Sequence, residues 1–335
     1  MFGKQNTSPV DMLSVGDVTT DAFIRISHAS IYRDDDNEEL ICLVNASKIP
    51  YESVTIVPAV GNSANAAVAA ARLGLRSALA ADVGDDTQGS ENITTLKKNK
   101  VITDWVRTHK NKKSNYHYVL WYHADRTILI KHETYERTLP TIPEPRWVYL
   151  SSLGEDALDY QEDVIGYVLT HPNIKLAFQP GTFQIKSGYD AFKEVYLRAE
   201  TFFCNVEEAR IILKDDTSNA PTLARIMHEK GPRIAVITDG PKGAYMATDD
   251  GVWYMPIYPD PKPPFERTGA GDAFASTFTT FLALGKTPEE ALVRAPINSM
   301  SVVQYVGAQE GLLPLSRIEQ LLSEKPEGYE PKKLA

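Results

Sequence analysis

The sequence predicts an α/β fold in which helices cover both faces of a mostly parallel sheet. From residue 147 onward, short apolar runs alternate with longer segments whose apolar residues recur at helical spacing, and repeated strand–helix units form parallel sheets. The strand candidates are continuous apolar runs, as expected for strands that are buried on both faces. Each run ends in a turn of polar residues or glycine, and α/β proteins bind their ligands at that end of parallel strands.

The elements of the alternating region can be assigned in chain order. Strands are predicted at residues 147–150, 175–178, 201–204 and 234–237, with helices at about 157–170, 189–198, 206–213 and 221–230. A hairpin over 245–254 and a proline-rich loop over 256–264 follow, and helices are then predicted over 274–282, 289–305 and 316–323. The tail, residues 324–335, is rich in Pro, Glu and Lys, and we expect it to fray.

The part of the chain before residue 147 mixes two kinds of segment. A first strand is expected over 11–18, and an alanine-rich helix over 66–73 is closed by Gly74. Residues 22–60 and 101–139 are instead β-rich, with polar turns between short apolar runs.

Composition narrows the range of functions. Apolar content of 43% and charged content of 24% are ordinary for a globular protein, and a net charge of −9 argues against nucleic-acid binding. Because the two cysteines, Cys42 and Cys204, match no metal or redox spacing, we expect a reducing, cytoplasmic setting. The sequence contains no apolar run long enough to span a membrane, so no membrane partner is expected.

The glycine-rich stretch 267–274 (Arg-Thr-Gly-Ala-Gly-Asp-Ala-Phe) leads directly into a predicted helix. The first N–H groups of a helix lack internal partners and lie at the positive end of its dipole, so they attract phosphate. Asp272, in the first turn, is placed to accept a proton from an attacking hydroxyl. The alternative for an isolated motif of this kind is a capped tight turn without chemistry.

Further polar groups follow predicted strands. Asp17 and Asp21 come at the end of the first strand, and Gly61 and Asn65 open the alanine-rich helix. Each could contact a polar ligand, or could serve only in turns and helix caps. The histidines at 117 and 132 match no metal-ligand spacing and are interpreted as structural.

Four segments, taken in order, resemble the ribokinase-like, or PfkB, carbohydrate kinases. Residues 61–67, running on to Arg-Leu-Gly at 72–74, resemble the N-terminal signature of that family, and 205–208 resemble its Asn-x-x-Glu motif. Residues 238–243 are similar to its nucleotide loop, and 268–272 to its C-terminal signature. The resemblance spans about residues 11–323 and includes Arg126, which is similar to the lid arginine of the family.

The resemblance implies a three-layer α/β/α fold, with one domain over 11–323 and a small lid built from the inserted segments 22–60 and 101–139. It implies ATP- and Mg²⁺-dependent phosphorylation of a sugar hydroxyl. The catalytic roles fall to Asp272 as general base, the backbone N–H groups of Gly269, Ala270 and Gly271 as an anion hole, and Arg126 on phosphate charge. The implied binding roles are substrate contacts by Asp17, Asp21, Gly61, Asn62 and Asn65, nucleotide contacts by Asn205, Thr238, Gly240, Gly243 and Thr268, and an Mg²⁺ site at Glu208, through water.

The chain departs from the family pattern at Val60, at Gln179 and at Glu266-Arg267, which replaces a common Asp-Thr. Since that last region often supplies ligands for a monovalent cation, dependence on K⁺ stays open. Alternatives to a sugar kinase are a nucleoside kinase of the same fold, a phosphosugar kinase that would need an added cation such as Lys48 or Arg33, and a non-catalytic sugar-binding relative. The family's lids often pair, so a homodimer through the lid is expected. The Walker sequence of P-loop kinases is missing.

Overall fold

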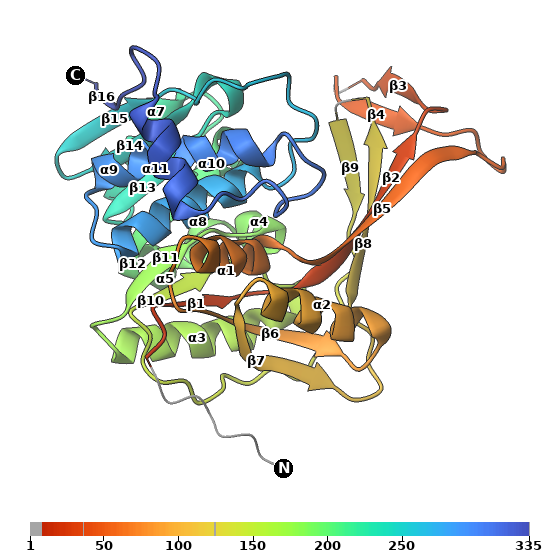
Figure 1. Cartoon of the computed structure of the whole chain (residues 1–335), viewed down its shortest axis with the longest axis horizontal. Coiled ribbons are helices and arrows are strands. Elements are labelled where there is room, and N and C mark those ends of the chain that lie inside the picture. The colour runs from red at the N-terminus through yellow and green to blue at the C-terminus, as the bar shows by residue number, and fades with distance from the viewer. Residues whose placement is uncertain (1–8, 36, 124, 335) are drawn as a thin grey trace.

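The computed structural model of the chain describes residues 9–35, 37–123 and 125–334. Its centre is a ten-stranded sheet, and the seven strands from β7 to β13 pair in parallel (Figure 1). In spatial order the strands are β7 (Ile102–His109), β6 (Ser77–Gly84), β1 (Met12–Val15), β10 (Trp147–Leu150), β11 (Lys175–Phe178), β12 (Ala199–Asn205), β13 (Ile234–Thr238), β14 (Ala244–Thr248), β15 (Gly251–Met255) and β16 (Lys332–Lys333).

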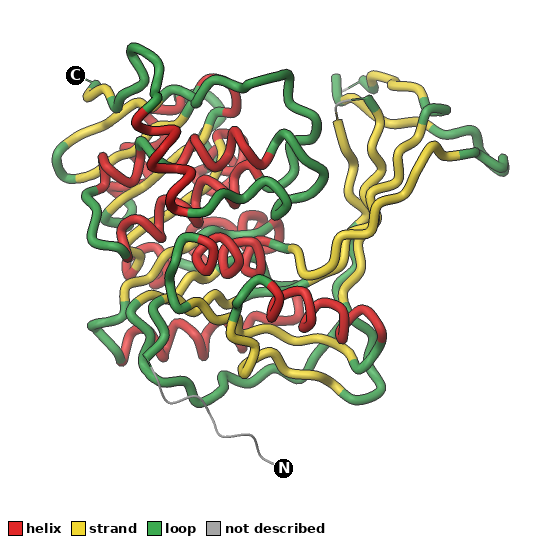
Figure 2. Tube along the Cα trace, viewed as in Figure 1, coloured by secondary structure: helices red, strands yellow, loops and turns green. Residues whose placement is uncertain are grey.

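Helices cover both faces of this sheet and so form three layers. Figure 2 shows helices lying over the strands in this view. One face packs against α3 (Leu158–Thr170), α4 (Thr182–Ala191), α5 (Lys193–Arg198), α6 (Val206–Leu213) and α7 (Ala220–Glu229). The other packs against α1 (Asn62–Arg72), α2 (Thr87–Lys98), α8 (Ala270–Ala283), α9 (Pro288–Leu292), α10 (Ala295–Val302) and α11 (Leu315–Ser323). The short 3₁₀ turns η1 (Glu155–Ala157) and η2 (Gly240–Lys242) complete the helical elements.

Helix α8 connects the core to the glycine-rich stretch 267–274. Its side chains Phe274, Phe278 and Phe281 recur at helical spacing and are at most 5% exposed. Phe278 packs edge-on against Phe203 of β12, with ring centroids 5.5 Å apart. This packing fixes the first turn of α8 against the end of a central strand, and so fixes the position of Asp272.

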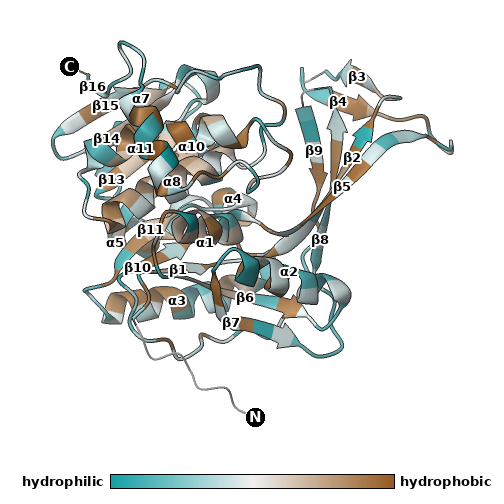
Figure 3. Ribbon diagram, viewed as in Figure 1, coloured by the Kyte–Doolittle hydropathy of each residue, from teal (hydrophilic) through white to brown (hydrophobic). Residues whose placement is uncertain are grey.

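A separate sheet projects from the core as a lid. It contains β5 (Tyr51–Val60), β2 (Thr19–Ile26), β8 (Asn115–Tyr122) and β9 (Asp125–Leu129) in that order, with the hairpin β3 (Ser30–Arg33) and β4 (Glu39–Cys42) at its tip. Figure 3 shows that apolar residues extend from the core into β4 and β5. The predicted fold class, a three-layer α/β/α core with a small β lid, is therefore observed.

Three details differ from the sequence-based expectations. β7 lies within the predicted lid segment 101–139, yet pairs with β6 in the large sheet, because Val101 and Trp105 are buried against the core. The predicted helix 289–305 is two helices, since Pro296 lacks the N–H that a continuous helix needs there. The tail does not fray: Tyr329 is 2% exposed and donates to the Val293 carbonyl at 2.8 Å, and β16 pairs with β15.

Every helix in the described part of the chain falls short of the length and apolar character that a membrane span requires.

Candidate active site

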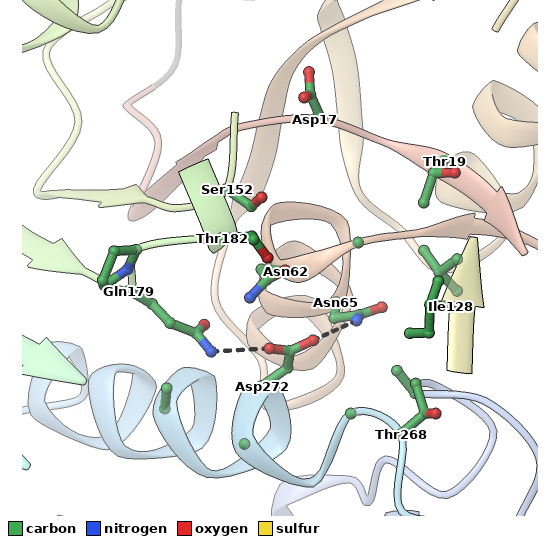
Figure 4. Close-up of a pocket in the computed structure, with 18 of the residues that line it drawn as sticks. Asp17, Thr19, Asn62, Asn65, Ile128, Ser152, Gln179, Thr182, Thr268 and Asp272 are labelled. Carbon is green, nitrogen blue, oxygen red and sulfur yellow. Dashed lines mark hydrogen bonds between the residues drawn. The ribbon is translucent and has the colours of Figure 1, made fainter. Parts of the chain in front are cut away.

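A cavity of about 390 Å³ lies between the carboxyl edge of the large sheet and the lid (Figure 4). Its floor comes from the ends of parallel strands: Asp17 follows β1, Ser152 follows β10, and Gln179 follows β11. Lid strands β2 and β9 supply Asp21, Arg126 and Ile128. Ligand sites of α/β proteins form at this edge.

The cavity gathers nearly all the residues that the sequence singled out. Of the predicted site residues, only Ala270, Gly240 and Gly243 are missing from its lining. Gly240 and Gly243 lie in and after the turn η2, beyond the end of β13, where Asp239 donates to the Gly243 carbonyl at 2.8 Å. The prediction that these two glycines contact a nucleotide therefore finds no support from the cavity lining, whereas Thr238 lies within it.

The carboxylate of Asp272 is held between two side-chain amides. Asn65 Nδ2 on α1 donates to Oδ2 at 2.7 Å, and Gln179 Nε2 donates to Oδ1 at 2.9 Å, as Figure 4 shows. The three side chains come from α1, from the end of β11 and from the first turn of α8. Because both oxygens are anchored from the protein side, the orientation of the carboxylate in the cavity is fixed before a substrate arrives.

Burial raises the pKa of Asp272 above its usual value, and the negative charge of Asp21 adds to that effect. The hydrogen bonds from Asn65 and Gln179, together with the positive charge of Arg126, act in the opposite direction without cancelling it. A carboxylate with a raised pKa is a better proton acceptor than an ordinary aspartate.

The two glycines before Asp272 have different surroundings. Gly269 has φ +80°, and a Cβ there would lie 2.2 Å from the Cβ of Ala308. Gly271 has ordinary helical geometry, and a Cβ there would meet no atom within 4 Å. Gly269 is therefore required by the fold of the loop, whereas the open space over Gly271 lies on the cavity side of the helix N-terminus, where a phosphate would sit.

Glu266 holds the loop that precedes α8 through hydrogen bonds to Thr268. Its side chain is 2% exposed and its Oε1 accepts from the backbone N–H of Thr268 at 2.7 Å and from the Thr268 hydroxyl at 2.5 Å. The same oxygen lies 3.6 Å from Arg126 Nη1 of the lid. This carboxylate therefore connects the glycine-rich loop before α8 to Arg126 of β9.

Asp17 and Asp21 differ in their partners, although both line the cavity. Asp17 Oδ2 accepts from His132 and from the Gly154 N–H, and Oδ1 accepts from Arg137, each at 2.8 Å. Burial alone would raise the pKa of Asp17, but these donors outweigh it and the pKa lies below its usual value. Among the described residues, Asp21 Oδ1 has no hydrogen-bond partner and lies 3.4 Å from His117 Nδ1. The carboxylate of Asp17 is thus fully hydrogen-bonded within the protein, whereas that of Asp21 has fewer protein contacts.

The Asn205–Glu208 pair forms the N-cap of α6. Asn205 Oδ1 accepts from the Glu208 N–H at 2.8 Å, and Glu208 Oε2 accepts from the Asn205 N–H at 2.9 Å. Burial raises the pKa of Glu208, and the charges of Asp272 and Glu207 raise it further, while the Asn205 N–H lowers it. Glu208 Oε2 takes part in the helix cap. The motif therefore both caps α6 and places the Glu208 carboxylate on the cavity wall.

Several lining residues carry no motif in the sequence. His117 and His132, which were interpreted as structural, line the cavity, and His132 packs edge-on against Phe183 at 5.6 Å between ring centroids. Thr182 and Ile130 also contribute. These positions come together only when the lid and the strand ends are folded. The sequence indicated this part of the cavity only through the predicted strand 175–178, which Gln179 and its neighbours follow.

Comparison with known proteins gives concordant matches. Residues 26–315 match the sequence model described as the pfkB family carbohydrate kinase. The chain is 28% identical to ribokinase from Bacillus subtilis (strain 168), over 78% of this chain and 87% of that protein.

Two solved structures show the same fold at low sequence identity. A nucleoside kinase of Methanocaldococcus jannaschii, an archaeal member of the ribokinase family, gives a TM-score of 0.76 at 17% identity over 95% of this chain and 100% of that one. Arabidopsis thaliana ribokinase complexed with ribose and ATP gives a TM-score of 0.75 at 18% identity over 94% and 99%.

Proposed function

Because this chain belongs to the pfkB family of carbohydrate kinases, we propose that it transfers the γ-phosphoryl group of ATP to a hydroxyl of a free sugar, with Asp272 as general base. Ribokinases and fructokinases of this family are phosphotransferases that act on sugar hydroxyls. The observation that carries the proposal is the Asp272 carboxylate, oriented by Asn65 and Gln179 at the N-terminus of α8 inside the cavity.

In this proposal the sugar hydroxyl gives its proton to Asp272 as its oxygen bonds to the γ-phosphorus, and the bond from that phosphorus to the β–γ bridging oxygen breaks to release ADP. The N–H groups of Gly269 and Gly271 stabilise charge on the transferring group, and each such donor contributes about 10²–10³ in rate. The expected contribution of Ala270 is not supported, since its N–H donates to the Arg267 carbonyl at 3.5 Å and the residue lies outside the cavity lining. The open space over Gly271 supports this placement of the phosphoryl group. Arg126, whose side chain is 29% exposed and reaches the cavity from the lid, adds a positive charge.

The carboxylate of Glu208 on the cavity wall suits Mg²⁺. Magnesium in kinases is held by one or two carboxylates together with water and substrate phosphates, and Glu208 supplies one such carboxylate on the cavity wall. Its raised pKa reflects burial beside other negative charges, an environment in which a cation favours the ionised form. When bound with ATP, Mg²⁺ would neutralise phosphate charge, and Glu208 would hold it through water.

The residues at Glu266-Arg267 do not suit a dedicated K⁺ site. Glu266 Oε1 already accepts two hydrogen bonds from Thr268 and lies beside Arg126, so its charge has a partner within the protein. We expect turnover to be the same in potassium, sodium and tetramethylammonium chloride. A tenfold or greater activation by K⁺ would contradict this assignment.

A nucleoside is the second candidate substrate, because part of the cavity wall is apolar. Ile128, Ile130 and Phe183 line it near His132, and a nucleobase could pack there. The M. jannaschii relative in this fold is a nucleoside kinase. A phosphosugar is disfavoured, since Arg33 and Lys48 lie in the lid hairpin region outside the cavity lining, and Arg33 pairs with Glu39.

The deciding experiment measures ADP release with ATP and Mg²⁺ over pentoses, hexoses, their phosphates and nucleosides. We expect turnover with one class of free sugar and a loss of about 10²–10⁴ in kcat for Asp272→Asn, with sugar binding retained. Asp215→Asn is the matched control, because Asp215 caps a surface turn at 217–218 away from the cavity. Normal turnover by Asp272→Asn would contradict the assigned base, and turnover only with nucleosides would favour the second candidate.

We further propose that the lids of two copies pair through their outer faces. Ile128 lines the cavity, so its neighbour Leu129 lies on the opposite face of the lid sheet, in register with Tyr118 and Ile56. Leu129, Tyr118 and Ile56 are 52%, 48% and 55% exposed. Adjacent apolar side chains with this exposure are typical of a protein–protein interface. Light scattering should give a dimer that Ile56→Lys converts to a monomer, and a monomeric wild-type chain would remove the proposal.

A further inference from the structure

Each amide that donates to Asp272 is itself held from behind by a buried side chain. The Tyr149 hydroxyl donates to Gln179 Oε1 at 2.5 Å. Gln309 Nε2 donates to Asn65 Oδ1 at 2.9 Å and to the Ala59 carbonyl at 2.6 Å. Tyr149 is 0% exposed and Gln309 is 6% exposed. Two short relays, one from β10 and one from the loop after α10, therefore converge on one carboxylate.

The Gln309 relay decides which end of the Asn65 amide faces Asp272, and the Tyr149 relay supports the matching orientation of Gln179. A primary amide that rotates by 180° exchanges its N–H₂ for its carbonyl oxygen, and that oxygen would repel the carboxylate. Gln309 Nε2 can only donate, so Asn65 must turn its oxygen toward Gln309 and its N–H₂ toward Asp272. The Tyr149 hydroxyl donates to Gln179 Oε1 at 2.5 Å, and this bond stabilises the orientation in which the Gln179 N–H₂ group faces Asp272.

We propose that Tyr149 and Gln309 are positioning residues of the phosphoryl-transfer site, which orient the amides of Gln179 and Asn65 so that both donate to the catalytic carboxylate. The inference rests on the proposed role of Asp272 as base. It assigns a function to two buried residues that no sequence motif marks.

The groups around Asp272 allow a clean test by pH. The charged or titratable side chains that act on it are Arg126 from β9, Asp21 from β2, Glu208 from α6 and Tyr149 from β10. Tyr149→Phe removes the phenolic oxygen and leaves the charged side chains around Asp272 unchanged. With the Gln179 amide no longer fixed, the carboxylate is less well stabilised, and protonation of Asp272 should occur at higher pH.

The experiment compares the pH dependence of kcat for wild type, Tyr149→Phe and Tyr329→Phe, with the sugar found by the substrate panel. Tyr329 is the matched control, because its buried hydroxyl also donates one hydrogen bond, to the Val293 carbonyl at 2.8 Å, and neither residue lines the cavity. We expect the acid limb of the profile in Tyr149→Phe to move up by roughly 0.5–1 pH unit, and kcat below the limb to fall about three- to tenfold. The KM for the sugar and the profile of Tyr329→Phe should stay unchanged.

Gln309→Met gives an independent test of the second relay, and the same upward shift is expected. In an Asp272→Asn background, Tyr149→Phe should have no further effect on the residual turnover, because the relay acts only through the carboxylate. An unshifted limb in both single variants, or an equal shift in Tyr329→Phe, overturns the relay while the loss of activity in Asp272→Asn still stands. Normal turnover by Asp272→Asn instead overturns the proposed function itself.

Discussion

The sheet edge and the lid both contribute polar groups to one cavity, but they differ in how those groups are paired. At the sheet edge, Asp272, Asn65 and Gln179 are joined by hydrogen bonds of 2.7–2.9 Å. On the lid, the buried atoms Asp21 Oδ1, His117 Nε2 and Arg126 Nε have no hydrogen-bond partner among the residues that the structure describes. The comparison suggests that the chemical end of the site is organised in advance and that the lid completes its contacts only when a ligand is bound.

The sharpest way to test this difference is to compare two carboxylates that stand four residues apart. Asp17→Asn should lower the free energy of unfolding by about 3 kcal/mol, because the guanidinium of Arg137, 3% exposed, loses its nearest carboxylate at 2.8 Å and keeps Asp156 and Asp82 at 3.8 and 3.9 Å. Asp21→Asn should not lower stability, because it removes a buried negative charge whose Oδ1 has no hydrogen-bond partner among the described residues. Urea denaturation of both variants measures this, and equal losses would remove the distinction between a fully hydrogen-bonded carboxylate and one with fewer protein contacts.

The Asp17 effect should also depend on pH in a defined direction. The folded-state pKa of Asp17 is lowered, so its contribution is fully present above the ordinary value of 3.8 and is lost as pH falls through the folded value. The stability gap between wild type and Asp17→Asn should therefore be constant from pH 7 to about pH 5 and narrow below pH 3.8. A gap that widens on acidification would contradict the ion-pair account.

The second test separates fold from ligand space within the turn itself. Gly269→Ala should cost roughly 2–5 kcal/mol of stability, since the positive φ and the close contact with Ala308 both oppose a Cβ. Gly271→Ala should leave the melting temperature unchanged or slightly raised, because alanine is the better helix former and the space is open. Its kcat should nevertheless fall, as the methyl group occupies the phosphate position. Full activity in Gly271→Ala would show that the phosphoryl group lies elsewhere.

The smallest expected effects belong to the lid. Arg126→Gln should leave the melting temperature within about 2 °C and lower kcat/KM for ATP by about tenfold, since a partly exposed charge contributes modestly to folding but acts on phosphate in the closed site. Arg25→Gln is a suitable control, as Arg25 pairs with Glu52 at the lid surface, outside the cavity lining. Equal losses in both variants would point to a general effect of lid charge.

The sequence could predict those parts of the site whose structure is set by residues close together in the chain. The turn, the helix start and Asp272 were predicted because glycine geometry and helix periodicity act over a few neighbouring residues. The partners Tyr149 and Gln309 could not be predicted, because they lie 30 and 244 residues from the amides that they orient. β7 was assigned to the lid for the same reason, since its pairing with β6 is a property of the assembled sheet.

The strand order of the large sheet has a consequence for how the protein is made. From β10 to β16 the strands lie side by side in the order in which they leave the ribosome, so each new strand can add to the open edge left by the one before. The edge is finally covered by β16, which is only two residues long and consists of Lys332 and Lys333. A short, charged edge strand is a poor template for pairing with another chain, so removing these lysines should favour aggregation of newly synthesised protein.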